Sequence, residues 1–456
     1  MSDKLLIGCG SGFSGDRLDV AAPVLDTLIA RASPAVLMFE TLGERTLALA
    51  QLARNADASV GYEPWLVELL APVLAPAIAH GIPIVGNFGA ANPEGAAHRI
   101  RQLARDLGIG DVSVGVVQGD DVREKVSSGA LEMWEDDDPG LLAGRDIIAA
   151  NAYLGAQPIA RALDAGCQIV VTGRVTDSAL ALGPLLHYFG WAEDDWDRLA
   201  AGVMAGHLLE CGAQVTGGYF ADPGFKDVED LAHVGYPIAE IDELGSIVLT
   251  KADHTGGCVN ERTVKEQLLY EIHDPHAYLT PDVILDMGNV TVREIAANQV
   301  LIDGARGRAP TETLKVTISY QGDWLGEAEI SYAGMNALHR AQLGGRIVRE
   351  RLADTLAQSA MRTDIIGAES VLDDNSGMLQ TRHADRADGD FRLRLAVQTP
   401  DQSVAERAMR EVLSLYCAGP AGGGGVRQHI SRRLGTVSCL LPRTEVQASF
   451  IILQDK

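Results

Sequence analysis

Apolar runs alternate with amphipathic stretches through the first half of the chain. Five short runs rich in Val, Ile and Leu have the length of buried strands, and the stretches between them repeat apolar residues at helical spacing. The expected strands are residues 4–7, 35–40, 83–87, 112–118 and 168–172. The expected helices between them are residues 17–31, 44–55, 65–80, 94–107 and 153–165. This alternation predicts an α/β fold with a parallel sheet covered by helices on both faces.

The second half follows a different pattern. Short strands come first, and two long helices over residues 336–358 and 403–415 then enclose a strand at 391–398. Polar residues 373–390 are expected to form a loop. We therefore expect a Rossmann-like α/β lobe that carries the binding site over residues 1–235. An α+β lobe is expected over residues 236–456.

Composition excludes several classes of function. The 456 residues are 46% apolar and 22% charged, with a net charge of −24. That charge repels nucleic acids and anionic membrane surfaces. The start of the chain lacks the long apolar core of a secretory signal, and no apolar stretch is unbroken enough to span a membrane. The six cysteines are scattered, which is typical of reduced thiols, so a cytoplasmic location is expected.

The first strand runs into a glycine-rich loop. Gly10, Gly12 and Gly15 have the spacing of a dinucleotide-binding turn, in which glycines let a phosphate approach the start of the following helix. In that interpretation Glu40, at the end of the second strand, would hold a ribose hydroxyl. The alternative is a tight strand-to-helix turn with no ligand.

Unusual loops follow all five expected strands of the first half. Ligands of open parallel sheets bind beyond the carboxyl ends of the strands, so we expect these loops to form one site for a small anion. Arg17 and Arg45 fall at expected helix starts, where the helix dipole disfavours a cation, and Arg174 precedes the helix that begins near Asp177. Each arginine could bind an anionic substrate or pair with a neighbouring carboxylate.

Further polar residues have two interpretations each. Glu40 could act as a general base if burial raises its pKa, or backbone N–H groups could satisfy it. Asn87 and Asn92 could polarise a carbonyl, or serve as turn residues. His254, with Cys258 nearby, could take part in catalysis. His207 and Glu210 share a helix face and could supply two metal ligands or an oriented general base. No third ligand is visible, so we expect no metal site.

Several ordered motifs give the chain a family resemblance. It resembles the acyclic terpene utilisation protein A family from the first strand to beyond Arg308, and the resemblance rests on the following motifs: IGCGSGFSGDR, FETLGERTLALAQ, NFGAANP, VTGRVTDSALALGPL, TGGYFADPGF, GYPIAEI and TGGCVNERTVKEQLLYEIHDP. The resemblance implies a catabolic enzyme acting on a small carboxylic acid or its coenzyme A thioester. Some members carry a carboxyl-terminal ferredoxin-like domain, or have a small separate protein of that type. Because this chain ends at Lys456, a separate ferredoxin-like partner subunit is expected, and a homo-oligomer is expected as well.

The leading hypothesis is a lyase or hydratase that adds or removes water, or cleaves a carbon–carbon bond, in a hydroxyacyl substrate. Glu40 or His254 would move protons, Asn87 would steady an enolate oxygen, and the arginines would hold a carboxylate. No cofactor is certain, and a coenzyme A thioester is the candidate substrate. The alternatives are an NAD(P)-dependent oxidoreductase and a non-catalytic subunit that binds an acyl-CoA.

Overall fold

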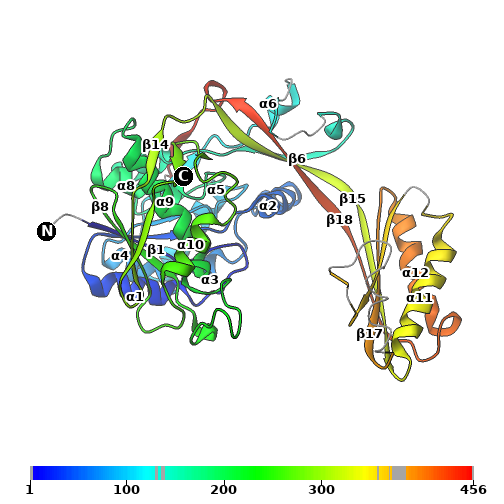
Figure 1. The fold of residues 1–456 in the computed structure, drawn as a ribbon. Helices are drawn as coiled ribbons and strands as arrows, with labels where there is room; N and C mark the ends of the chain where they lie inside the picture. The colour runs from blue at the N-terminus through cyan, green and yellow to red at the C-terminus, as the bar shows by residue number, and fades with distance from the viewer. Residues whose placement is uncertain are drawn as a thin grey trace. The chain divides into compact units, whose positions relative to one another are not determined.

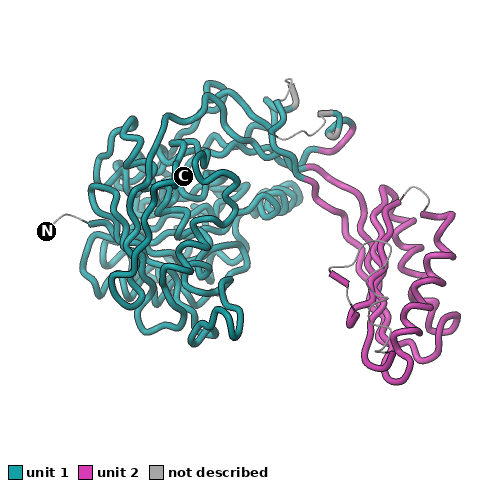
Figure 2. Tube along the Cα trace, in the orientation of Figure 1, with its two compact units in different colours: residues 1–143, 147–319, 436–456 teal, residues 144–146, 320–435 magenta. Residues whose placement is uncertain are grey.

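The chain folds into two compact units in a computed structural model (Figures 1 and 2). Unit 1 comprises residues 1–143, 147–319 and 436–456, and unit 2 comprises 144–146 and 320–435. The structure describes residues 4–128, 132–134, 139–356, 359–368, 370–371 and 387–453. This division differs from the expected boundary at 235/236, because residues 236–319 add four strands to the large sheet of unit 1.

Unit 1 contains a ten-stranded sheet with a parallel centre. Its order is β12-β13-β9-β8-β1-β2-β3-β7-β4-β19, and the strands from β1 to β4 in this order are parallel. The flanking pairs are antiparallel. The strands are β1 (Lys4–Cys9), β2 (Ala35–Phe39), β3 (Ile84–Gly86), β4 (Val114–Gln118), β7 (Ile169–Val171), β8 (Pro237–Asp242), β9 (Ile247–Lys251), β12 (Thr291–Ala296), β13 (Gln299–Asp303) and β19 (Ser449–Ile452). All five strands expected in the first half are present, at the centre of the sheet.

The helices of unit 1 follow from the direction in which the chain winds. It passes from β1 through β2 and β3 to β4, then returns to β7. Right-handed crossovers therefore place the early helices on one face and α7 on the other. α1 contacts β1 and α5 contacts β4, whereas α7, α8 and α9 pack in succession. The helices are α1 (Ala21–Arg31), α2 (Glu44–Ala56), α3 (Leu66–Leu70), α4 (Leu74–Ala79), α5 (Pro93–Asp106), α6 (Arg123–Ser128), α7 (Gln157–Asp164), α8 (Ala179–Phe189), α9 (Trp196–Glu210) and α10 (Glu261–Leu269).

Two expected helices differ from the structure. The helix expected at 17–31 begins only at Ala21, since residues 10–20 form a loop. The helix expected at 65–80 is divided into α3 and α4. The short strands β5 (Glu132–Met133), β6 (Ile147–Ala152), β10 (Tyr278–Leu279), β11 (Ile284–Asp286) and β14 (Arg306–Arg308) complete the elements around unit 1.

Unit 2 has a β-α-β-β-α-β order. Its sheet runs β16-β17-β15-β18, and the two pairs formed by β17 are antiparallel. This order and topology are those of a ferredoxin-like fold. The elements are β15 (Thr313–Gly334), α11 (Ala337–Leu352), β16 (Ala360–Ile366), β17 (Gly389–Thr399), α12 (Gln402–Ala418) and β18 (Gly424–Pro442). Alternate residues of β17, such as Leu393, Leu395 and Val397, form one core with both helices.

Two expectations concern segments outside this framework. Most of the loop expected at 373–390 lies outside the described residues. In the described part of the chain, no helix combines the length and the apolar character needed to cross a membrane.

Candidate functional site

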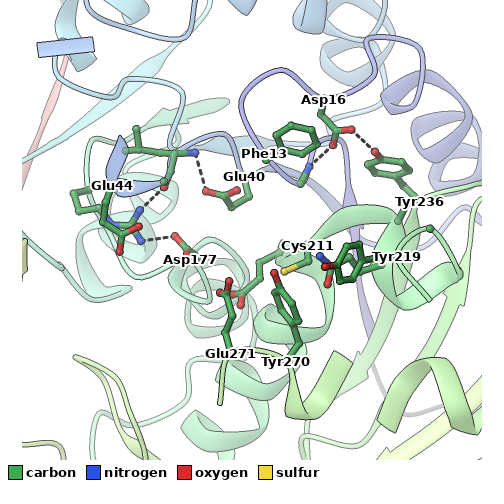
Figure 3. Close-up of a pocket in the computed structure, with 18 residues that line it drawn as sticks. Phe13, Asp16, Glu40, Glu44, Asp177, Cys211, Tyr219, Tyr236, Tyr270 and Glu271 are labelled. Atoms are coloured by element: carbon green, nitrogen blue, oxygen red, sulfur yellow. Dashed lines mark hydrogen bonds and ion pairs between the residues drawn. The ribbon is translucent and has the colours of Figure 1, made fainter. Parts of the chain in front are cut away.

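A cavity of about 510 Å³ lies within unit 1, at the carboxyl ends of β1, β2 and β7 (Figure 3). Loops that follow these strands form one side of it. The ends of α9 and α10 and the residue before β8 form the other side. The lining residues are Gly12, Phe13, Asp16, Glu40, Leu42, Gly43, Glu44, Arg174, Asp177, Glu210, Cys211, Ala213, Gln214, Gly218, Tyr219, Tyr236, Tyr270 and Glu271.

Glu40 is the most constrained acid of this cavity. It directly follows buried strand β2 and is only 7% exposed. Its Oε1 accepts hydrogen bonds from the backbone N–H of Leu42 (2.8 Å) and from Nδ2 of Asn87 (2.9 Å). Burial and the nearby Asp177 charge outweigh these bonds and raise the Glu40 pKa to about 8. Burial therefore favours the protonated form of the Glu40 carboxyl.

Arg174 is the arginine that lines the cavity, and other residues of the protein already bind its guanidinium. The residue follows β7 and is 2% exposed. Its Nη2 donates to Oδ1 of Asp177 (2.6 Å), and its Nη1 donates to the carbonyl of Leu42. The guanidinium lies 4.2 Å from the ring centre of Tyr153. Burial disfavours its charge, but Asp177 and other acids more than offset this effect and raise the Arg174 pKa.

Glu44 begins helix α2 at the edge of the cavity. It accepts a hydrogen bond from the Tyr153 hydroxyl, and the Lys315 ammonium lies 3.8 Å away. Burial raises the pKa of this carboxyl, but Tyr153 and Arg174 lower it further, so the net shift is downward. No side chain caps the α2 N-terminus at Gly43. The backbone N–H of Glu44 already bonds the carboxylate of the same residue, and both Gly43 and Glu44 line the cavity.

Asp16 closes the loop after β1. Its Oδ2 accepts from the backbone N–H of Gly12 (2.7 Å), and its Oδ1 accepts from the N–H of Arg17 (2.8 Å) and from the Tyr236 hydroxyl. Figure 3 shows this Asp16–Tyr236 contact beside Phe13. Burial, followed by the Asp16 charge, raises the pKa of Tyr236. The loop after β1 is therefore folded around the carboxylate of Asp16.

The glycine turn serves this folded loop. A Cβ on Gly12 would lie 2.6 Å from the backbone nitrogen of Gly212, and one on Gly10 would lie 2.7 Å from the Phe39 ring. Gly15 has a φ of +92°. The close approach is therefore to the protein's own backbone and ring. Because α1 starts six residues after Gly15, the expected dinucleotide-binding turn is wrong in its geometry.

Two of the expected anion-binding arginines do not reach the cavity. Arg17 binds exposed Asp19 at 2.8 Å and donates to the carbonyl of Val234. Arg45 is exposed on α2 and is not part of the lining. For Arg17 the ion-pair interpretation therefore applies, and Asp19 is the neighbouring carboxylate. Only Arg174 among the three lies where a ligand could bind.

The net charge of the cavity also differs from expectation. Its lining holds one arginine, already paired, and the following six acids: Asp16, Glu40, Glu44, Asp177, Glu210 and Glu271. Burial, with Glu210 and Glu44, raises the pKa of Asp177 to about 7 despite Arg174. Such a lining repels a free carboxylate, so the expectation of a small anionic ligand in this cavity is corrected.

The remaining candidates have structural positions. Asn87 is fully buried and binds Glu40 and the N–H of Thr41, so it is not open to an enolate oxygen. Asn92 caps α5 by accepting from Gly95, the role of a turn residue. His254 is exposed in a turn with a φ of +59° and does not line the cavity. The proposed catalytic role of His254 therefore has no support from the geometry.

The loops after β3 and β4 lie next to the site and hold its residues in place, although they do not line the main cavity. Oδ2 of Asp120 accepts from the N–H of Arg174 and from Nδ2 of Asn151, both at 2.9 Å. These loops line a separate cavity of about 230 Å³ that includes Asn92 and Asp120. The five strand-end loops thus share one edge of the sheet, but only three of them open onto the main cavity.

Sequence reasoning missed part of the lining. Tyr236, Tyr270 and Glu271 lie in motifs that carry the family resemblance, but no spacing within those motifs pointed to the cavity. The one available signal was the i, i+3 spacing of His207 and Glu210. Within the described residues, no group of three or more His, Cys, Asp or Glu side chains is arranged to hold a metal ion.

Fold and site together define an α/β protein with an acid-lined cavity at the carboxyl edge of a parallel sheet. Residues 5–452 match the family model described as acyclic terpene utilisation family protein AtuA. The chain therefore belongs to this family, which confirms the resemblance. No curated protein and no solved structure matches the chain.

Proposed function

We propose that this protein is a catabolic lyase or hydratase that acts by proton transfer on an uncharged acyl group, such as the acyl end of a thioester. The observation that carries the proposal is the buried carboxyl of Glu40, whose pKa is raised by burial, at the edge of a cavity large enough for a small substrate. A carboxyl that keeps its proton near pH 7 can give it to a leaving hydroxyl group.

The other groups of the cavity suit the same chemistry. The N-terminus of α2, where Gly43 and Glu44 line the cavity, can stabilise through the helix dipole negative charge that develops on a carbonyl oxygen. Arg174 holds Asp177 and the Leu42 carbonyl, and so fixes the backbone that carries Glu40. The acidic lining disfavours a free acid as substrate. It tolerates a thioester, whose reacting end has no charge.

The proposal is tested with a panel of β-hydroxyacyl thioesters of N-acetylcysteamine, assayed for loss of water. Glu40→Gln should lower turnover on the order of 10²-fold or more, the usual contribution of a general acid, while the protein still unfolds cooperatively. Turnover that is unchanged in this variant would contradict the role of Glu40. Activity on the free acids but not on the thioesters would contradict the substrate class.

The two alternatives make different predictions. An NAD(P)-dependent oxidoreductase should alter the fluorescence of added NADH, whereas we expect no change because the glycine loop packs on Gly212. A non-catalytic subunit should bind thioesters without turnover, even with a small partner added. Unit 2 of this chain has the ferredoxin-like order of elements itself, so the reason for expecting a separate subunit of that type no longer holds. Co-purification can still test for a partner subunit, and light scattering can test the predicted homo-oligomer.

A further inference from the structure

A buried histidine–carboxylate pair lies at the wall of the cavity and has no part in the chemistry assigned to Glu40. His207 and Glu210 stand one turn apart near the end of α9. Nδ1 of His207 and Oε1 of Glu210 are 2.8 Å apart. His207 is 1% exposed and Glu210 is 8% exposed, and Glu210 lines the cavity. Burying a charged pair of this kind costs free energy unless hydrogen bonds of good geometry satisfy both partners.

The surroundings hold this pair in one orientation. The side chain of Gln267 on α10 donates to the carbonyl of His207 (3.0 Å), and the ring of Tyr278 on β10 lies 5.6 Å from the imidazole. Burial opposes a charge on His207, but the Glu210 carboxylate and hydrogen bonds outweigh it, so the pKa of His207 is raised.

One oxygen of Glu210 has no partner in the described structure. Oε2 is shielded from solvent and makes no hydrogen bond, while Oε1 is held by His207. Unsatisfied buried carboxylate oxygens are rare and call for an explanation. Nε2 of His207 is likewise buried without a partner. Glu210 lines the cavity through its other atoms, so Oε2 gains a partner only when the carboxylate turns toward a bound substrate.

We propose that Glu210 is the general base that complements Glu40, and that His207 is its positioning residue. This inference rests on the proposed function. It assigns two roles to two carboxyls of one cavity, a proton donor and a proton acceptor, which is how a pair of carboxyls divides acid and base work. Asp177 lies within electrostatic reach of both acids, since its charge raises the pKa of Glu40 and its own pKa is raised by Glu210.

The elimination of water from a β-hydroxyacyl thioester conserves atoms and electrons. The Cα–H bond breaks and its proton moves to Oε2 of Glu210, while the electron pair forms the Cα=Cβ bond. The Cβ–O bond breaks, and the leaving hydroxyl takes the proton of Glu40 to become water. Glu40 and Glu210 then return to their starting states by proton exchange with solvent, and the reverse sequence adds water.

The experiment follows exchange of the substrate α-hydrogen in D₂O by NMR, using the N-acetylcysteamine thioesters as probes. Glu40→Gln should keep this exchange while losing the elimination of water. Glu210→Gln should lose both, with exchange falling on the order of 10²-fold. His207→Asn should slow the exchange and shift the base-dependent limb of its pH profile. A merely structural role of His207 would leave that limb in place.

His187 provides a matched control. It pairs with Asp164 at 2.6 Å but is more than one-third exposed, and it does not line the cavity. His187→Asn should leave exchange and elimination unchanged. Exchange at the wild-type rate in Glu210→Gln would overturn the assignment of the base.

A second readout needs no substrate. The imidazole NMR signal of His207, assigned with His207→Asn, should titrate at lower pH in Glu210→Gln, because the charge that stabilises the imidazolium is gone. The other groups that face the pair are Asp177, Tyr278 and Cys211, and they stay in place. An unchanged His207 midpoint would overturn the ion pair. A wild-type protein that is inert toward every thioester would instead contradict the proposed function. The titration midpoint of His207 would still test whether His207 and Glu210 form an ion pair.

Discussion

Asn87 bridges Glu40 and the backbone of the loop after β2. Its Nδ2 donates to Oε1 of Glu40 at 2.9 Å, and its Oδ1 accepts from the N–H of Thr41 at 2.7 Å. All three residues are buried, so the amide holds the acid in place and satisfies a backbone donor with the same side chain. This relation fixes the part of the site on which the proposed chemistry depends.

Asn87→Ala should raise the Glu40 pKa above its wild-type value, because a hydrogen bond to the charged form is lost. It should also destabilise the protein by about 1–3 kcal/mol, because the N–H of Thr41 is left buried without an acceptor. Urea unfolding and a carboxyl NMR titration measure the two effects. Asn92→Ala, which removes only a helix cap, should cost about 1 kcal/mol and leave the Glu40 titration unchanged.

Glu40 should also make stability depend on pH. Its pKa is about 8 in the folded protein, whereas the ordinary value for an exposed glutamate is 4.5, so the folded state keeps a proton that the unfolded chain loses between these values. The free energy of unfolding should therefore fall as pH rises from 4.5 to 8. Glu40→Gln should flatten this decline, whereas Glu68→Gln, on the surface of α3, should keep it. Equal slopes in wild type and Glu40→Gln would argue against a buried neutral acid.

The order of elements was largely predictable from the sequence, because buried parallel strands give continuous apolar runs such as Ala35–Phe39. The strands β8 and β18 were not expected, since Pro237–Asp242 and Gly424–Pro442 sit among turn residues that mask their pattern. The rule that ligands bind beyond the carboxyl ends of parallel strands correctly placed four residues at one cavity: Gly12, Glu40, Arg174 and Asp177.

The character of the site could not be predicted in the same way. Whether Arg174 is open to a ligand depends on Asp177 and on the carbonyl of Leu42, and no spacing rule reports such a contact. The ring of Tyr153 and the hydroxyl of Tyr236 come from segments whose approach is set by tertiary packing. Local patterns therefore gave the position of the cavity but not the acidic character of its lining.

Arg174→Met should destabilise the protein on the order of 3 kcal/mol, because it leaves Asp177 without its counter-ion and removes the contact with Tyr153. The double variant Arg174→Met/Asp177→Asn should recover part of this loss, which a double-mutant cycle would show. The exposed Arg161→Met, 4.0 Å from Glu193, should change stability by less than about 0.5 kcal/mol. Additive effects at Arg174 and Asp177 would refute their coupling.

Gly12→Ala should displace the wall of the cavity. The new Cβ would meet the backbone nitrogen of Gly212 at 2.6 Å, and the backbone can yield only by moving the turn that follows α9. We expect a loss of about 1–3 kcal/mol and weaker thioester binding. Gly424→Ala has open space around the new carbon and should not destabilise the protein. Thermal unfolding of both variants compares them directly, and equal melting temperatures would contradict the close packing of the loop.

The most direct test of the central claim is the titration of the Glu40 carboxyl in the intact protein. Glutamate labelled with carbon-13 at its side-chain carboxyl gives one signal per residue, and the signal missing in Glu40→Gln identifies the residue. We predict a midpoint near pH 8, well above the ordinary value of 4.5. A midpoint near 4.5 would mean that Glu40 is ionised at neutral pH, and it could not then be the proton donor of the proposed reaction.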